Sequence, residues 1–125
     1  MKITTGRMDN GQIANKHQGK RLADGVLMHV VTLACKDPHH AAEFLAVLAE
    51  HARRDAMAYN CLAFEFGLKE GTDDTVYLVE RWRCWEDLDA MLAERVEPVM
   101  PVYNALLKRP FDPAADSVRL VLAAR

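Results

Sequence analysis

The stretch TVYLVERWRCWEDLDAML, residues 75–92, decides the fold because a strand passes directly into a helix within it. Its first half alternates with the period of two that is typical of a strand. Its second half changes to the spacing of three and four that is typical of an amphipathic helix. The alternation predicts one strand face made of Val76, Leu78, Glu80 and Trp82. An inward glutamate needs a partner and an inward tryptophan needs an acceptor for its N–H, so this face indicates a lined pocket more than a plain core.

Composition narrows the class of protein. A chain of 125 residues, half of them apolar, is long enough for one domain with a modest core. The net charge of −2 and the scattered positions of the basic residues argue against a nucleic-acid partner. No apolar run approaches the roughly 18–20 residues of a membrane span, so we expect no membrane association. Three widely spaced cysteines argue against a disulfide framework and favour a reducing cytoplasm.

The chain divides by composition into two parts, residues 1–26 and residues 27–125. The first part is polar and basic and has little that could fill a core. We interpret it as a flexible N-terminal arm, and the alternative is an arm that packs on the acidic body of a partner subunit. The second part contains the predicted domain.

The periodicity of residues 27–125 predicts the order β-α-β-β-α-β. Strands are expected at 27–35, 61–68, 75–82 and 117–123, and helical segments at 37–56, 85–94 and 97–108. Asp37 is the expected N-cap of the first helix, with Pro38 at its first position, and Asn60 is the expected left-handed exit. A break is expected near Glu97-Pro98, and Pro110 and Pro113 are expected to bracket a loop.

This order is the split βαβ, or ferredoxin-like, sandwich, an α+β fold with a four-stranded antiparallel sheet. Two helices can cover only one face of such a sheet, yet the strands are apolar on both faces, as Val30 and Val31 illustrate. A bare face would be a large exposed apolar patch. We therefore expect a second copy of the chain to bury it, sheet against sheet, in a two-fold homodimer.

Residues 27–124 resemble the antibiotic biosynthesis monooxygenase (ABM) domain family, which belongs to the dimeric α+β barrel superfamily. Three stretches carry the resemblance: LMHVVTLACKDPHHAAEFL, YNCLAFEFG and, above all, YLVERWRCWEDLDAML with its Glu80-x-Trp82 strand end. The family includes cofactor-free oxygenases of aromatic phenols and quinols, haem-degrading enzymes and members without a known role. Relatives that degrade haem would use a histidine in the second helix and an asparagine on the first strand. Here Arg95 or a neighbour stands at the histidine position and the first strand has no asparagine, which counts against haem breakdown.

The resemblance implies a cofactor-independent monooxygenase acting on a small phenol, quinol or polyketide-like aromatic, with no cofactor and no metal. Such an enzyme needs an apolar slot, a base or hydrogen-bond network for the phenol proton, and donors for the anion that develops. The candidate catalytic residues are Trp82, Arg95, Tyr103 and His51, and the candidate substrate contacts are Asn60, Glu80, His29, Phe44 and Met100.

Most of these residues also have a structural interpretation. Trp82 and Tyr103 could be ordinary core residues, Glu80 could pair with Arg83 or Arg95, and the two histidines could lie at strand or helix edges. The pair His39-His40 is not expected to bind metal, because adjacent helical residues point apart. Cys84, near a helix N-terminus, could have a lowered pKa, although no histidine or second cysteine is evident beside it.

A second hypothesis is a non-catalytic dimer of the same fold that binds a small ligand or serves in a stress response. The interior between the helices and the sheet distinguishes a ligand-binding protein from one with a plain core. A cavity of about 300 Å³ or more with two or three convergent polar groups would favour a ligand site. An interior filled by Phe44, Leu48, Met100 and Tyr103 would favour a plain core.

Overall fold

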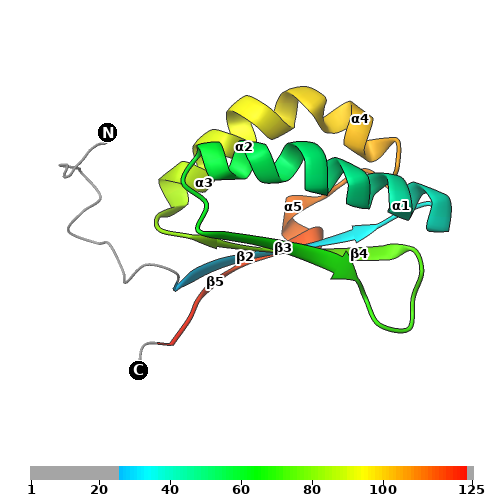
Figure 1. The fold of residues 1–125 in the computed structure, drawn as a ribbon, viewed down its shortest axis with the longest axis horizontal. Helices are drawn as coiled ribbons and strands as arrows, with labels where there is room; N and C mark the ends of the chain where they lie inside the picture. The colour runs from blue at the N-terminus through cyan, green and yellow to red at the C-terminus, as the bar shows by residue number, and fades with distance from the viewer. Residues whose placement is uncertain (1–25, 124–125) are drawn as a thin grey trace.

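The computed structural model describes residues 26–123, and the predicted arm therefore lies, except for its last residue, outside the described residues. A four-stranded sheet forms one layer and two long helical runs form the other (Figure 1). The strands are β2 (Leu27–Ala34), β3 (Ala63–Leu68), β4 (Thr75–Trp82) and β5 (Ser117–Val121). Their order in the sheet is β3-β4-β2-β5, and every neighbouring pair is antiparallel. The predicted ferredoxin-like fold is confirmed.

The first helical run consists of α1 (Pro38–Val47), the π-helical stretch η2 (Leu48–Ala52) and α2 (Arg53–Ala58). The run begins where expected, because the Asp37 carboxylate accepts a hydrogen bond from the backbone N–H of His40 at 2.8 Å. It ends near Asn60, which has a φ of 71° and provides the predicted left-handed exit into β3.

The second helical run consists of α3 (Trp85–Met91), the π-helical stretch η3 (Leu92–Val96), the 3₁₀ turn η4 (Glu97–Val99) and α4 (Met100–Asn104). The 3₁₀ turn lies at the predicted proline break. The helix is shorter than predicted, because the backbone after Asn104 turns back to the end of β2. There the N–H of Lys108 donates to the carbonyl of Ala34 at 2.9 Å.

The loop expected between Pro110 and Pro113 is present, and it leads into a short helix that was not predicted, α5 (Pro113–Asp116). Its N-cap is Asp112, whose carboxylate accepts a hydrogen bond from the N–H of Ala114 at 3.1 Å. Pro113 lies in the first turn of this helix, because its fixed φ suits a helix N-terminus.

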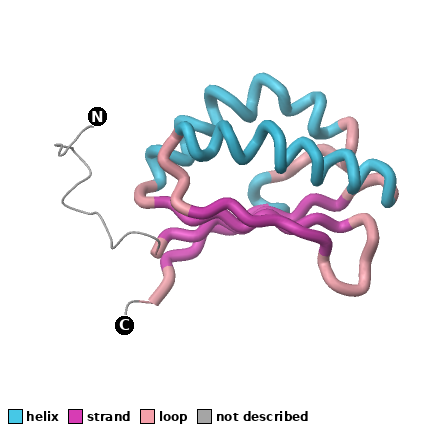
Figure 2. The backbone as a smooth tube through the Cα atoms, viewed as in Figure 1, coloured by secondary structure: helices cyan, strands magenta, loops and turns pink. Residues whose placement is uncertain are grey.

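Among the described residues, all helices lie on one face of the sheet, and the opposite face is bare (Figure 2). The core lies between the two layers, where the largest fully buried side chains are Trp82, Leu88, Val76 and Cys35. On the bare face, Tyr77, Val118 and Leu120 are exposed by 37%, 48% and 39%.

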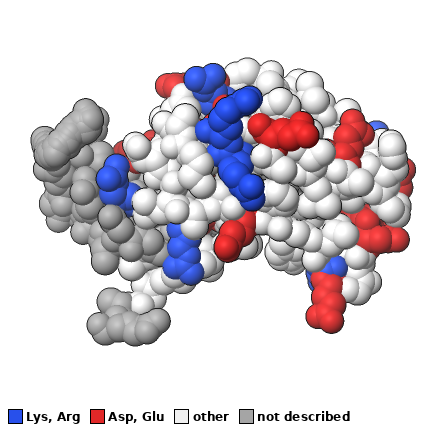
Figure 3. All heavy atoms as spheres, viewed as in Figure 1, with Lys and Arg blue, Asp and Glu red and all other residues white. Residues whose placement is uncertain are grey.

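The outer surface carries charges of both signs (Figure 3). On the face shown, basic side chains gather toward the left and centre, and acidic ones lie mainly toward the right. Within the described residues, no helix is long and apolar enough to cross a membrane.

Candidate functional site

A cavity of about 460 Å³ lies between the helical layer and the sheet. Its floor is formed by β2 and β4, and its roof by the two helical runs. Most of its lining is apolar, including Val31, Phe44, Leu48, Phe64, Leu78, Met91 and Met100. The exposed lining residues Glu97, Pro113, Ala114 and Arg119 place its mouth between η4 on one side and α5 and β5 on the other.

The deepest polar groups of the cavity are a histidine and a glutamate that are paired with each other. His29 on β2 lies directly opposite Glu80 on β4, and both side chains point toward the helices. The Nδ1 atom of His29 is 2.8 Å from Oε1 of Glu80. The residues are only 6% and 3% exposed. The indole N–H of Trp82 also donates to Glu80 Oε1, at 3.0 Å.

This arrangement orients the imidazole for proton transfer. With Nδ1 donating to the carboxylate, Nε2 is the ring nitrogen that Glu80 does not engage, and in the neutral ring it carries a lone pair. A carboxylate behind a histidine fixes its tautomer and stabilises the imidazolium that forms when a proton is accepted. The pair can therefore take a proton from a hydroxyl group bound in the cavity.

The partner predicted for Glu80 was an arginine, and that interpretation is wrong. Its partners are His29 and Trp82, because the register of β2 against β4 places His29 directly across from it. Arg83 follows the strand one position beyond Trp82, and Arg95 is exposed on η3. Trp82 itself is fully buried and supports Glu80 from the core rather than lining the cavity.

The predicted contacts Phe44, Met100 and Tyr103 all line the roof of the cavity. The rings of Phe44 and Tyr103 are 5.4 Å apart between centroids, and both helical runs therefore meet above the cavity. Burial, followed by the negative charge of Asp55, raises the pKa of the Tyr103 hydroxyl. These side chains border a cavity of about 460 Å³ and do not fill it. The cavity also contains the polar groups of His29 and Glu80, so the structure meets the volume and polarity criterion for a ligand site.

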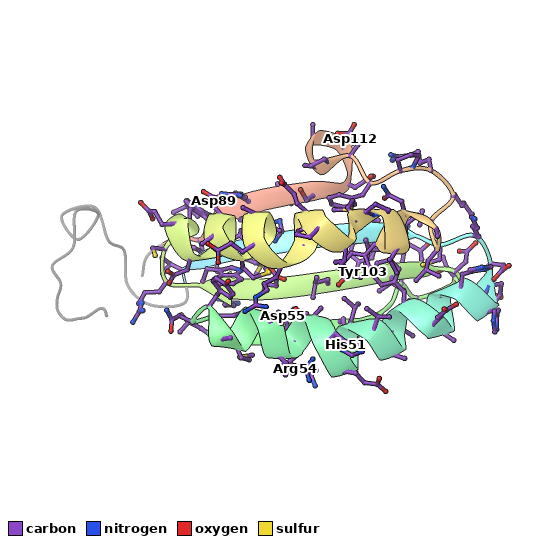
Figure 4. All side chains as sticks on the ribbon, turned by 90° about the horizontal axis from the view of Figure 1, so that it is seen from above. His51, Arg54, Asp55, Asp89, Tyr103 and Asp112 are labelled. Carbon is purple, nitrogen blue, oxygen red and sulfur yellow. The ribbon has the colours of Figure 1, made fainter. Side chains whose placement is uncertain are left out.

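Three other candidates lie outside the cavity. Arg95 is exposed, and its guanidinium lies 5.9 Å from the ring centroid of Tyr59. His51 is exposed beside Arg54, and Figure 4 shows both on the outer side of the first helical run. Asn60 is exposed at the helix exit, where its role is conformational. The structure therefore does not bring these residues together with His29.

Three charged lining residues were missed by the sequence interpretation, Asp55, Glu97 and Arg119. Asp55 follows the apolar stripe of the first helix at the spacing of three from Ala52, so the helical period could have placed it. Arg119 is on β5 opposite His29, a position that needed the strand register. Its guanidinium binds Asp89 at 2.6 Å and lies 5.1 Å from the ring centroid of Trp85.

All three cysteine thiols are buried, and burial raises their pKa. Burial raises the pKa of Cys84 to about 11, and the nearby charge of Asp87 adds to this effect. The possibility of a lowered pKa at the helix N-terminus is therefore wrong, because desolvation outweighs the backbone N–H bond from Asp87. Within residues 26–123, no group of three or more histidine, cysteine or acidic side chains could hold a metal ion.

No protein-family model matches the sequence, and no curated protein is significantly similar to it. Solved structures do match. A monooxygenase of Streptomyces coelicolor, solved in complex with the ligand nanaomycin D, has a TM-score of 0.65 at 13% identity and covers 82% of this chain and 90% of its own. A Caulobacter crescentus protein provisionally named an antibiotic biosynthesis monooxygenase has a TM-score of 0.64 at 16% identity and covers 88% of this chain and 100% of its own.

The chain has the fold of the antibiotic biosynthesis monooxygenases. The resemblance to this family is thereby confirmed at the level of the fold. A protein from an uncultured marine organism, described as a dimeric ferredoxin-like protein, is also similar, with a TM-score of 0.59 at 9% identity over 79% of this chain and 89% of its own. Likeness at such low identity carries no statement about substrate or activity.

Proposed function

We propose that this chain is a cofactor-independent monooxygenase that oxidises a small phenol, quinol or polyketide-like aromatic with dioxygen. The observation that carries the proposal is an apolar cavity whose deepest polar group is an imidazole held by a buried carboxylate. The volume of about 460 Å³ is in the range of small-molecule sites. The monooxygenase names of structures that share the fold support the proposal.

In the proposed reaction, Nε2 of His29 accepts the proton of the phenol hydroxyl, and Glu80 stabilises the imidazolium. The electron-rich phenolate then gives one electron to dioxygen, and the two radicals combine to form a carbon–oxygen bond at a ring carbon. The ring carbon loses its hydrogen as a proton while the O–O bond breaks. One oxygen atom stays on the ring as a quinone carbonyl, and the other leaves as water. Phenol and dioxygen together thus supply every atom and electron of quinone and water.

The apolar walls contribute to this reaction by excluding water. The lining residues Val31, Phe44 and Met91 cannot hydrogen-bond a ring, so they hold it by apolar contact and leave its hydroxyl to the polar floor. A dry site also strengthens the interaction between phenolate and imidazolium.

We further propose that the functional unit is a homodimer and that it resides in the cytoplasm. The bare sheet face carries Met28, Val30, Val79, Val118 and Leu120, which form a continuous apolar surface across three strands. A second copy is a suitable partner, because the same surface on both chains is self-complementary under two-fold symmetry. The reducing compartment is supported by the free, buried state of all three cysteines.

The test is oxygen consumption by the purified, metal-free protein with a set of dihydroquinones and naphthols. His29→Gln removes the base but keeps an amide that can bond to Glu80. We expect uptake to fall about 100-fold or more in this variant. The matched control is His39→Gln, which alters an exposed histidine on α1 and should leave the rate unchanged.

Two outcomes would oppose the proposal. Equal uptake by wild type and His29→Gln would remove the base from the mechanism. Saturable binding of the same aromatics without any uptake above the uncatalysed rate would instead favour the non-catalytic ligand-binding module.

A further inference from the structure

The charges that line the cavity are unbalanced toward the negative. Three carboxylates line it, those of Asp55, Glu80 and Glu97, against one guanidinium, that of Arg119. Glu80 is paired with His29, and Arg119 is paired with Asp89 outside the lining. The remaining negative charge therefore comes from Asp55 in the roof and Glu97 at the mouth.

Asp55 is the more informative of these two residues because it is partly removed from water. It is half-buried on α2 and lies between the two helical runs, together with Tyr103 (Figure 4). Within residues 26–123 its carboxylate makes no hydrogen bond and no ion pair of ordinary length. Arg95 is the cation that interacts with it over a longer distance, and Arg95 is exposed with its guanidinium 5.9 Å from the ring centroid of Tyr59.

A carboxylate in this position favours one class of ligand and rejects another. Partial burial without a partner is unfavourable, and a ligand that brings a positive charge removes this penalty. A ligand carboxylate would add like-charge repulsion from Asp55 and Glu97. The guanidinium of Arg119 is already bound to Asp89 and lies over the ring of Trp85, so it is poorly placed to offset this repulsion.

We propose that the ligand of this cavity is a phenol that carries a basic amine, with the ammonium bound by Asp55 in the roof and the phenol hydroxyl at His29 on the floor. The two groups belong to opposite layers, so one molecule that crosses the cavity meets both. This inference rests on the proposed function for the role of the phenol end. Its charge selectivity is a property of binding and does not depend on turnover.

The test measures binding without oxygen, so that reaction cannot interfere. Dissociation constants of dopamine, ethylcatechol and dihydrocaffeic acid are compared by calorimetry, because the three share the ring and differ in the charge of the side chain. We expect dopamine to bind about tenfold more tightly than dihydrocaffeic acid, with ethylcatechol between them. Added salt should reduce this preference in the wild-type protein.

The variant Asp55→Asn should bring the dopamine and dihydrocaffeic acid constants to within about threefold of each other. The matched control is Asp73→Asn, which removes one negative charge from the exposed β3–β4 hairpin and should leave the ratio unchanged. If Asp55→Asn fails to fold, the salt dependence of the wild-type preference still decides the question.

The inference is overturned if dihydrocaffeic acid binds as tightly as dopamine, if the preference survives Asp55→Asn, or if none of the three binds. Charge-selective binding without oxygen uptake would keep this inference and remove the proposed enzyme activity. Oxygen uptake with neutral naphthols and no charge preference would do the opposite.

Discussion

At the scale of single residues, Glu80 explains why the strand end in the sequence is unusual. Its carboxylate is almost completely buried and would be costly there alone, but His29 and Trp82 both bond to the same oxygen, Oε1. The three side chains form a single polar unit inside an apolar core. The energetic consequence is that removing Glu80 leaves both His29 and Trp82 without this partner.

We expect Glu80→Ala to lower the free energy of unfolding by about 2–4 kcal/mol, because it leaves a buried imidazole and a buried indole N–H unsatisfied. Urea denaturation measures this effect. The double variant with His29→Ala should cost less than the sum of the two single variants, because the pair loses one shared interaction. Strict additivity would contradict the coupling of these residues.

The buried thiols predict a loss of stability at alkaline pH. Burial raises the pKa of Cys61 and of Cys84 to about 11, whereas an exposed thiol has a pKa near 9. The unfolded chain releases these protons as the pH passes 9, but the folded chain keeps them until the pH approaches 11. The stability that they contribute is therefore complete below pH 9 and declines as the pH rises from 9 to 11.

The double variant Cys61→Ser, Cys84→Ser checks this effect, because a hydroxyl can make similar hydrogen bonds without titrating in that range. Its absolute stability can differ from that of the wild type. Its unfolding free energy should decline less steeply between pH 9 and 11 in a pH series of denaturation curves. Parallel curves would show that the thiols keep their ordinary pKa.

At the scale of elements, local signals placed the helix starts well and the helix ends less well. Asp37-Pro38 is a local cap, so its effect does not depend on the rest of the fold. The end of α4 at Asn104 depends on backbone bonds to the distant β2, and no local residue signals it. The π-helical stretches η2 and η3 both border the cavity, and their geometry also has no single-residue signature.

Asn60 provides a clean test of the helix exit, because it is exposed and its φ of 71° lies in the left-handed region. We expect Asn60→Gly to be neutral or slightly stabilising and Asn60→Ala to cost about 1 kcal/mol, since a Cβ disfavours this conformation. Thermal or urea unfolding of both variants measures the difference. Equal stabilities would show that the exit does not require the left-handed conformation.

At the scale of the whole molecule, the two faces of the sheet have different roles. The face toward the helices contains the polar floor of the cavity, and the bare face carries exposed apolar residues such as Tyr77 and Leu120. An apolar sheet face of this kind is unfavourable in water. Covering it with a second copy would also shield β2 and β4, which hold His29 and Glu80.

We expect Val30→Lys to convert the proposed dimer into a monomer, because it places a charge at the centre of the bare face between Val79 and Val118. Light scattering coupled to gel filtration measures the mass. The control is Val102→Lys, the same substitution at a site on α4 that is 62% exposed. A wild-type protein that is already monomeric at micromolar concentration would contradict the dimer.

The fold was predictable from local pattern, because hydrophobic period, caps and prolines act within a few residues and specify each element where it stands. Alternation alone placed Glu80 and Trp82 on the inward face. Five of the lining residues were also named from the sequence, namely His29, Glu80, Phe44, Met100 and Tyr103, but the contacts among the site residues were not predictable in this way. His29, Glu80 and Arg119 meet through strand register, and Asp55 joins them through helix packing, so residues far apart in the chain become neighbours only when the layers close. Arg95 and His51 had suitable chemistry in the sequence but lie on the outer surface, because the direction of a side chain relative to a cavity is set by tertiary packing.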